Sequence, residues 1–550
     1  MLVKLWSSAL HGIEAKPIRI EVAIHQGIGY HMVGLPDNAI RESWHRIETA
    51  LKTLGYSMPR QKIIVNLAPA DLRKEGSSFD LCIALGILGA SGQIDIERFT
   101  QYLILGELSL DGMVKHVQGI LAMSRVAFDL NLKGLILPEK NRLQGQWIKS
   151  MPMIFIASLA ELLSQNNTKE ECFEPPLRKE YSGIASTDIP DFKDVYGQTI
   201  PKRAMQIAAA GGHNLLLIGP PGAGKTMLSR CLPSILPALS YEEFIETLSI
   251  HEVAGQNIDN ILTGLRPFRD PHHTTSDVAL VGGGRFPQPG EISLAHNGVL
   301  FLDEMYEFKR STLEVLRQPI ESHKITISRS NGKVEFPARF MLIASVNPCP
   351  CGYLNHPAIQ CTCSSRKIAQ YQSKISGPLL ERIDLQIGVE PIDAKTLLEV
   401  DSTTKLDNQS SEVLREGVLQ ARQRQKDRFN ATGLNEQIML NSMMSSAQIK
   451  ALVKLDGPCR KLLQHTIDKL NLSARLAPTH SAPTHRPTLP HTAPCPHGVT
   501  LFVALSTSRQ PRPPSPSQVT LFVYLNTLPE GVGHTDFPQI GLSVHPSSSP

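Results

Sequence analysis

The chain is 550 residues long, with 41% hydrophobic residues, 19% charged residues and a formal net charge of +4. This length exceeds what one hydrophobic core holds, so we expect two to four domains of a globular protein, with any nucleic-acid surface confined to a local patch. The sequence argues against a membrane span or a secretory signal, because it has no run of about eighteen apolar residues and its start soon turns polar. We expect a cytoplasmic protein.

Residues 1–165 alternate short apolar runs with turn signals and form the first predicted domain. Within it, residues 18–24 and 62–67 predict strands, and the apolar run over 79–88 predicts a buried helix. Residues 166–190 are polar, charged and proline-containing, which is typical of a linker.

Residues 191–400 alternate apolar strands with helical stretches, which predicts an α/β domain on a parallel sheet. One glycine-rich segment follows an apolar strand and precedes a helix, which is the context of a phosphate-binding loop. Its glycines let the backbone curl so that amides point at phosphates. The predicted nucleotide contacts are Gly219, Pro220, Pro221, Gly222, Ala223, Gly224, Lys225, Thr226 and Met227.

A second segment, Val299-Leu-Phe-Leu-Asp303-Glu304, is an apolar strand that ends in two acids. We expect Lys225 to contact the β and γ phosphates of ATP, while Thr226 and Asp303 hold Mg²⁺. Glu304 would then polarise the attacking water. The two segments together predict an ATP-hydrolysing site with ATP and Mg²⁺ as its cofactors.

Two further side chains have alternative interpretations. Asn347 ends a buried strand, where it either orients the water from the far side or forms a turn with the following proline. Arg382, near a helix end, either reaches the γ-phosphate of a neighbouring subunit or makes a surface ion pair.

Residues 325–336 predict a hairpin, because β-branched residues alternate about Asn331-Gly332, a favoured turn. Lys324, Arg329 and Lys333 give the hairpin a positive edge that suits phosphates. The alternative is a solvated edge that its charges protect from pairing.

Four of the nine cysteines lie within fifteen residues, at positions 349, 351, 361 and 363. An odd number of cysteines with one cluster favours reduced thiols. Cys349, Cys351, Cys361 and Cys363 either close a tetrahedral zinc site, with His356 as a spare ligand, or cap a loop as free thiols.

Residues 401–477 are helical and charged in pattern, and the composition changes after them. Residues 478–550 hold 14 of the 40 prolines and no lysine, so we expect disorder there. Within this segment, residues 499–505 recur as 519–525; the two heptamers could pair as strands, but they resemble aggregation-prone segments more closely.

The chain resembles the YifB/ComM proteins, a bacterial family of magnesium-chelatase-like AAA+ ATPases. The resemblance covers about residues 1–475 and rests on residues 195–198, 219–226, 266–275, 289–304, 347–352 and 377–384.

The resemblance implies a hexameric ring that drives DNA branch migration as a helicase in natural transformation or recombination. It also implies that residues 255–295 form an insert, and that the hairpin touches single-stranded or branched DNA. The roles it implies are an adenine pocket at Tyr196 and Gly197, a sensor at Asn347, a trans-acting arginine finger at Arg382, and a lid arginine at Arg475. The rival functions are metal insertion into a tetrapyrrole, as in magnesium chelatase, and a chaperone-like ATPase that acts on protein.

The resemblance further implies that residues 1–165 are a Lon-protease-like α+β domain of the ChlI type. Ser78 stands at the position of the protease nucleophile, but Leu121 replaces the lysine that should act as its base. A serine without a base is a weak nucleophile, so we expect a domain without peptidase activity.

The resemblance ends after Arg475, where family members continue into a lid helix. Pro478 stops that helix here, so we expect an incomplete lid over 401–477 and an atypical tail beyond it. We therefore expect the chain to bind ATP, to hydrolyse it poorly and to assemble rings weakly.

Overall fold

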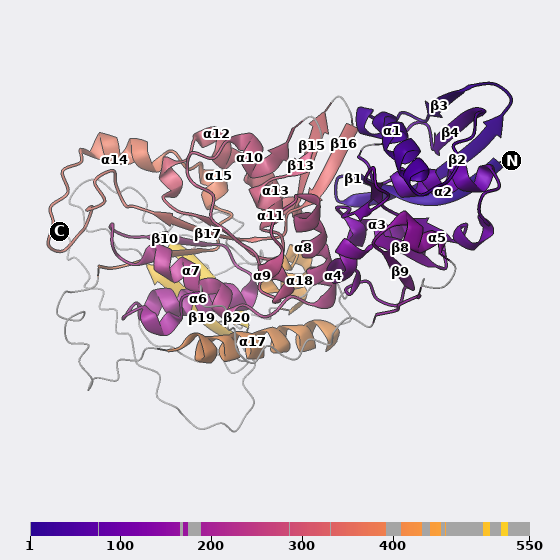
Figure 1. Cartoon of the computed structure of the whole chain (residues 1–550). Coiled ribbons are helices and arrows are strands. Elements are labelled where there is room, and N and C mark those ends of the chain that lie inside the picture. The colour runs from indigo at the N-terminus through magenta and orange to yellow at the C-terminus, as the bar shows by residue number, and fades with distance from the viewer. Residues whose placement is uncertain are drawn as a thin grey trace, which may run out of the picture.

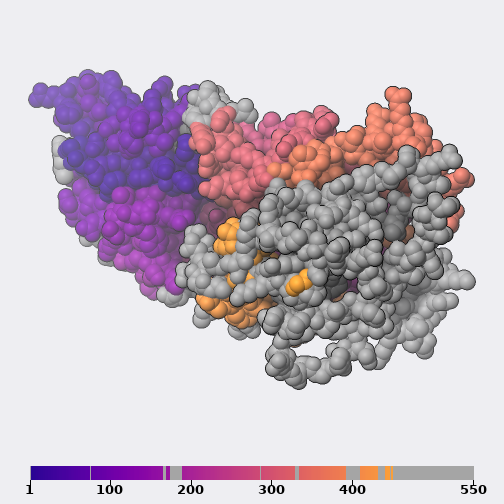
Figure 2. Space-filling view, turned by 180° about the vertical axis from the view of Figure 1, so that it is seen from behind, coloured from indigo at the N-terminus to yellow at the C-terminus, as the bar shows by residue number. Residues whose placement is uncertain are grey.

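The computed structural model describes residues 2–74, 76–164, 169–173, 189–284, 287–329, 332–391, 409–431, 440–452, 457, 499–505 and 519–525. Two α/β units lie side by side, and both views of the molecule place the N-terminal unit at one end (Figures 1 and 2). No helix in the described part of the chain is both long and apolar enough to span a membrane.

The N-terminal unit is built on a mixed seven-stranded sheet in the order β3-β4-β2-β1-β5-β8-β9. Its strands are β1 (Leu2–His11), β2 (Glu14–His25), β3 (Gly29–Val33), β4 (Lys62–Ala68), β5 (Tyr102–Ile104), β8 (Gly134–Pro138) and β9 (Met153–Ile156), with the separate pair β6 (Glu107–Leu108) and β7 (Val114–Lys115). Its helices are α1 (Asn38–Thr53), α2 (Asp80–Ala90), α3 (Ile120–Asp129), α4 (Arg142–Gly145) and α5 (Leu159–Leu163).

The three elements predicted in this unit are present. The predicted strands over 18–24 and 62–67 lie within β2 and β4, which pair antiparallel with each other. The predicted buried helix is α2, and every one of its residues is buried: the sequence after Asp80 is apolar on all sides, and Asp80 itself pairs with Arg46.

The second unit carries a five-stranded sheet in the order β11-β14-β17-β10-β18, and every neighbouring pair in it is parallel. This confirms the predicted α/β architecture with a parallel sheet. Its strands are β10 (Leu215–Ile218), β11 (Phe268–Arg269), β14 (Val299–Leu302), β17 (Met341–Val346) and β18 (Leu385–Gly388).

Helices cover both faces of this sheet, as buried parallel sheets require (Figure 1). On one face lie α6 (Thr199–Gly211), α7 (Lys225–Ile235) and α17 (Ser411–Ala431); on the other lie α10 (Asp277–Val281), α11 (Glu291–Leu294), α12 (Arg310–Glu314), α13 (Arg317–Ser322) and α15 (Gly377–Leu380). The remaining elements are α8 (Tyr241–Val253), α9 (Asp259–Leu262), α14 (Ser365–Gln372), α18 (Ser446–Leu452) and the strand pair β12 (Gly282–Gly283) and β13 (Gln288–Pro289).

Alternate residues along the central strands enter two different cores. Leu215 and Phe301 pack with α6, α7 and α17, whereas Leu216 and Leu302 pack on the opposite face. The strands are consequently buried on both sides, and this holds their carboxyl ends in a fixed row.

An apolar cluster joins the two units. Leu121 and Met123 of α3, from the N-terminal unit, share it with Phe244 and Leu248 of α8, from the second unit. The carboxylate of Glu252 in α8 also accepts hydrogen bonds from the first amides of α3. The N-terminal unit is therefore packed directly onto the second unit.

Two further segments can be compared with the expectations from sequence. Residues 169–173, expected in the linker, lie against the N-terminal sheet, where Glu171 pairs with Met153 of β9. Within the range of the helical pattern expected over 401–477, α17 spans Ser411–Ala431, and its Leu414 and Val418 pack on the α6–α7 layer.

The heptamers near the C-terminus pair as antiparallel strands β19 (Val499–Leu505) and β20 (Val519–Leu525). This is the alternative that the repeat left open. The rest of the proline-rich segment lies outside the described residues, as does Arg475.

Candidate functional site

The predicted phosphate loop joins the carboxyl end of β10 to the first turn of α7. Gly222 and Gly224 adopt φ angles of 76° and 86°, a region that favours glycine. A Cβ on Gly219 would lie 2.3 Å from the carbonyl oxygen of Val389, so a side chain there would clash with backbone. The loop thus presents its amides at the N-terminus of an 11-residue helix, where the helix dipole favours an anion.

Lys225 lies buried at the start of α7. Its Nζ donates to the carbonyl oxygens of Gly219 and Pro220, at 2.8 and 2.9 Å, and to Oδ1 of Asn347, at 3.1 Å. Burial lowers the pKa of this amine, while the charges of Asp303 and Glu304 act in the opposite direction. Hydrogen bonds to the phosphate loop therefore hold the amine of Lys225 inside that loop.

The predicted magnesium ligands lie next to each other. Oγ1 of Thr226 donates to Oδ2 of Asp303 across 2.8 Å. Asp303 follows β14 directly, and β17 lies between β14 and β10 in the sheet. Asn347, which follows β17, is consequently placed between the phosphate loop and the acidic residues.

Ser345 completes this edge of the sheet and was missed by the sequence reasoning. Its hydroxyl donates to Oδ1 of Asp303 and accepts the backbone N–H of Glu304 at 3.1 Å. Glu304 itself adopts φ 50° and ψ 49°, a left-handed conformation that is unfavourable for a residue with a side chain. The signal in the sequence was one hydroxyl within an otherwise apolar strand.

Asp270 is a second acidic residue that sequence reasoning gave no role. It follows β11, the strand next to β14, and Arg230 donates to its carboxylate at 3.2 Å. Burial raises the pKa of Asp270, and the nearby charge of Asp303 adds to this rise. The signal was the same one that identified Asp303, an acid at the end of a strand.

The segment proposed as an adenine pocket lies beside the phosphate loop. Gln198, the residue after Tyr196 and Gly197, donates to the carbonyl oxygen of Ala223 at 3.2 Å. The same amide donates to the carbonyl oxygen of Glu390 at 2.7 Å. The residue that follows Tyr196 and Gly197 therefore contacts the phosphate loop directly.

Arg382 lies at the opposite edge of the sheet. Its carbonyl oxygen accepts a 3.0 Å bond from Asn214, which precedes β10, whereas the phosphate loop follows β10. Its guanidinium pairs with Glu321 at 2.5 Å, and its side chain is 11% exposed. Arg382 therefore does not join the nucleotide site of its own chain, and within the chain it makes the ion pair that was the alternative expectation.

The predicted hairpin is formed by β15 (Lys324–Arg329) and β16 (Gly332–Pro337). Arg329 pairs with Gly332, so Gly332 belongs to β16, while Asn331, the other residue of the predicted turn, lies outside the described residues. The exposed amines of Lys324 and Lys333 both approach Glu335, at 3.9 and 3.0 Å, which offsets part of the expected positive edge.

The N-terminal unit does not bring a lysine to the position of the expected base. Leu121 occupies that position and is buried in the apolar cluster between the units. Ser78 is buried, and its carbonyl oxygen accepts the amide of Gly106.

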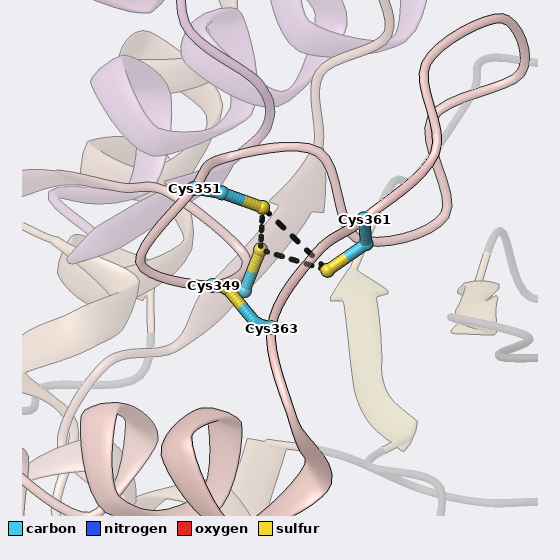
Figure 3. A group of neighbouring side chains, drawn as sticks. All are labelled: Cys349, Cys351, Cys361 and Cys363. Carbon is cyan, nitrogen blue, oxygen red and sulfur yellow. Dashed lines mark hydrogen bonds between the residues drawn. The ribbon is translucent and has the colours of Figure 1, made fainter.

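Four cysteine side chains converge on the loop after β17, as Figure 3 shows. The Sγ atom of Cys349 lies 3.3 Å from that of Cys351 and 3.6 Å from that of Cys361. The backbone amides of Tyr353 and Thr362 donate to Sγ of Cys351 and lower its pKa to about 6.

His356, expected as a spare ligand, has a different role. Its Nδ1 accepts the backbone amides of Ala358 and Ile359, at 3.2 and 3.0 Å. Both hydrogen bonds engage Nδ1 of His356 in a local turn. Among the described residues, the group that could hold a metal consists of the four cysteines alone.

Three family models match successive parts of the chain. Residues 20–141 match subunit ChlI of Mg-chelatase, residues 191–397 match the model described as magnesium chelatase, subunit ChlI, and residues 408–479 match the C-terminal part of that subunit.

Whole-chain relatives are found among bacterial proteins. YifB of Escherichia coli is 39% identical over 465 residues, which cover 84% of this chain and 88% of YifB. Competence protein ComM of Haemophilus influenzae is 38% identical over 483 residues, covering 86% and 91%. The magnesium-chelatase 38 kDa subunit of Rhodobacter capsulatus is 25% identical over 189 residues, covering 31% and 54%.

Proposed function

The chain belongs to the YifB/ComM family of magnesium-chelatase-like proteins, and on that premise we propose that it is an AAA+ ATPase motor that remodels DNA. The observation that carries the ATPase proposal is the meeting of Lys225, Thr226, Asp303, Glu304 and Asn347 at one edge of the parallel sheet. Such a family implies ATP and Mg²⁺ as cofactors.

Each side chain has a distinct role in this proposal. The amine of Lys225 exchanges the carbonyl oxygens of its own loop for the β and γ phosphates of ATP. Thr226 and Asp303 hold Mg²⁺, which neutralises charge on the phosphates. Glu304 orients and polarises the attacking water, and the amide of Asn347 positions it from the opposite side.

The ring belongs to the same proposal. Because Arg382 lies at the sheet edge away from its own phosphate loop, it serves a neighbouring protomer's γ-phosphate as an arginine finger in a hexamer. That role requires the ion pair with Glu321 to open when the subunits assemble. Residues 401–477 form an incomplete lid, with Arg475 as its nucleotide contact, and residues 1–165 form an inactive Lon-protease-like domain.

DNA is the substrate that the relatives favour. One relative, which matches 86% of this chain, is named competence protein ComM, and competence is the capacity of a cell to take up DNA. The hairpin of β15 and β16 buries Ile325 and Phe336 and turns Lys324 and Lys333 to solvent, so it offers two exposed cations on a rigid support. The proposed action is ATP-driven branch migration.

The test compares ATP hydrolysis and branch migration on a four-way DNA junction. The double variant Lys324→Ala and Lys333→Ala should lose most DNA stimulation and keep its basal ATP turnover. Lys52→Ala, an exposed lysine of the N-terminal unit, is the matched control. If DNA stimulates ATP hydrolysis equally in the hairpin variant and the control, the hairpin is not part of the DNA-binding surface.

The other candidate functions give different outcomes in the same assay. A chaperone-like ATPase would be stimulated by unfolded protein and not by junction DNA. The magnesium-chelatase 38 kDa subunit of Rhodobacter capsulatus is 25% identical over 31% of this chain, whereas ComM is 38% identical over 86% of it, which gives a chelatase role less support than a DNA motor.

A further inference from the structure

Four cysteine side chains form a compact cluster at the edge of the proposed ATPase centre. All four sulfur atoms lie within 4.8 Å of one another, although Cys349 and Cys363 are fourteen positions apart. Cys349 is fully buried, and the other three are half-buried. The two Cys-x-Cys pairs thus meet from opposite ends of one loop (Figure 3).

The spacing of the sulfur atoms fits a tetrahedral metal site. With a zinc–sulfur bond of about 2.3 Å, a tetrahedron places its sulfur atoms about 3.8 Å apart. The Sγ atoms of Cys349, Cys351 and Cys361 lie 3.3, 3.5 and 3.6 Å from one another. Four thiolates converging at this distance repel each other unless a cation lies between them.

Backbone amides support the same site. The N–H groups of Tyr353 and Thr362 point at the sulfur of Cys351, and the N–H of Cys363 points at the sulfur of Cys361. Donors of this kind orient thiolate ligands and partly neutralise their charge. Because Thr362 comes from the second Cys-x-Cys pair and Cys351 from the first, this contact joins the two halves.

The loop that carries the cluster also contacts the nucleotide site. It begins at Asn347, whose side chain accepts the amine of Lys225, and Cys349 follows two residues later. Gly352, at φ 83°, packs against the phosphate loop so closely that a Cβ there would lie 2.5 Å from Cδ of Pro221. Movement of this loop would therefore disturb both Asn347 and the phosphate loop.

We propose that Cys349, Cys351, Cys361 and Cys363 bind one zinc ion, and that this ion holds Asn347 and the phosphate loop in the geometry that ATP hydrolysis requires. The zinc is structural, because four protein ligands leave no open position for substrate. The second half of this proposal rests on the proposed ATPase function; the first half does not.

The first experiment measures metal in the purified full chain. We expect about one zinc per chain by elemental analysis. Replacement of zinc by cobalt under anaerobic conditions should give thiolate charge-transfer bands and the d–d bands of tetrahedral cobalt. A chain with no zinc and no cobalt spectrum, a chain with iron instead, or a disulfide within the cluster would each overturn the zinc assignment.

The second experiment separates positioning from general stability. Cys361→Ser should lose zinc and lower ATP turnover by at least tenfold, with a smaller effect on the affinity for a fluorescent ATP analogue. Cys361→His supplies a nitrogen ligand and should recover both zinc and turnover. Cys172→Ser, which alters an exposed cysteine outside the cluster, should change neither.

The outcomes distinguish the two parts of the proposal. If the parent chain binds zinc and does not hydrolyse ATP, the ATPase proposal fails and the metal site stands. If Cys361→Ser loses zinc but hydrolyses ATP at the parental rate, the ion does not position the ATPase centre. Loss of zinc with proportionate loss and recovery of turnover across the Ser and His variants supports both parts.

Discussion

The hydroxyl of Thr226 donates a 2.8 Å hydrogen bond to the carboxylate of Asp303, although the two residues are 77 positions apart in the chain. Thr226 lies in the first turn of α7 and Asp303 directly follows β14, so the parallel sheet brings them together. An oxygen pair of this kind is preorganised for a hard cation such as Mg²⁺. Substrate binding then needs little rearrangement of the metal ligands.

The first prediction separates binding from hydrolysis. Glu304→Gln should bind ATP as the parent does and hydrolyse it at least about a hundredfold more slowly, because the amide cannot polarise water. Lys225→Ala should instead lose ATP binding, because the phosphates lose the amine. Nucleotide affinity and single-turnover hydrolysis measured on both variants check this, and parental hydrolysis by Glu304→Gln would place the activating group elsewhere.

The second prediction concerns Ser345, which bonds both Asp303 and the backbone of Glu304. Ser345→Ala leaves the strand buried but removes a bond to a charged group, worth about 1.5–3 kcal/mol. We expect kcat to fall about tenfold or more while KM for ATP stays close to the parental value. A change in KM alone would mean that Ser345 contributes to ATP binding and does not position Asp303 and Glu304 for hydrolysis.

Much of this site was predictable from sequence because strand ends carry its chemistry. The apolar runs before Gly219 and Asp303 fix parallel strands, and parallel strands align their carboxyl ends. Ser345 and Asp270 were not found, because one hydroxyl in a buried strand or one acid after a two-residue strand has many structural explanations. The strand order supplies the missing information. Ser345 lies on β17 and Asp270 follows β11, and these two strands flank β14, after which Asp303 stands.

The packing between the units could not be predicted from local patterns. Leu121 and Phe244 are apolar residues in two helices, and nothing in either helix specifies the other as its partner. Glu252 is likewise an ordinary helical acid in the sequence. Its role depends on a long-range contact with α3, across more than a hundred residues.

The third prediction uses that contact. Burial raises the pKa of Glu252 to about 7, although the amides of Ile120 and Leu121 bond its carboxylate. The folded protein therefore holds a proton that the unfolded chain has released between about pH 4.5 and pH 7. Since the unfolded state binds fewer protons there, this group lowers the free energy of unfolding as pH rises through that window, by about 3 kcal/mol in total.

Glu252→Gln keeps a carbonyl acceptor and removes the titration. Relative to the parent, the variant should gain stability from about pH 4.5 to pH 7 and level off above pH 7, which denaturant midpoints at several pH values measure. Glu242→Gln, an exposed acid on the same helix, should show no such trend. Parallel pH profiles for Glu252→Gln and the parent would show that the carboxylate stays ionised in the folded state.

The fourth prediction tests whether Arg382 acts on a neighbouring protomer. Arg382→Ala and Lys225→Ala should each abolish turnover alone. In a mixture, some interfaces combine an intact phosphate loop from one protomer with an intact Arg382 from the next. We expect mixing to restore a fraction of the activity, whereas a cis role for Arg382 predicts a mixture as inactive as its components.

The fifth prediction concerns the chain after Arg475. A lid arginine couples closure over the nucleotide to hydrolysis only if its helix is stable. Pro478 removes a helical N–H and clashes with the preceding turn, at about 3 kcal/mol within a helix. The sequence that follows has no apolar periodicity that would offset this cost, so we expect slow ATP turnover and weak ring assembly.

Replacing the residues after Arg475 by the corresponding residues of Escherichia coli YifB should raise ATP turnover and ring assembly together. Steady-state hydrolysis and sedimentation velocity, measured on the present chain and the chimera at equal concentrations, check this. Because assembly supplies Arg382 to each site in the proposed ring, the two gains should occur over the same range of protein concentration. Equal turnover by both chains would show that the helices following Arg475 are dispensable for hydrolysis.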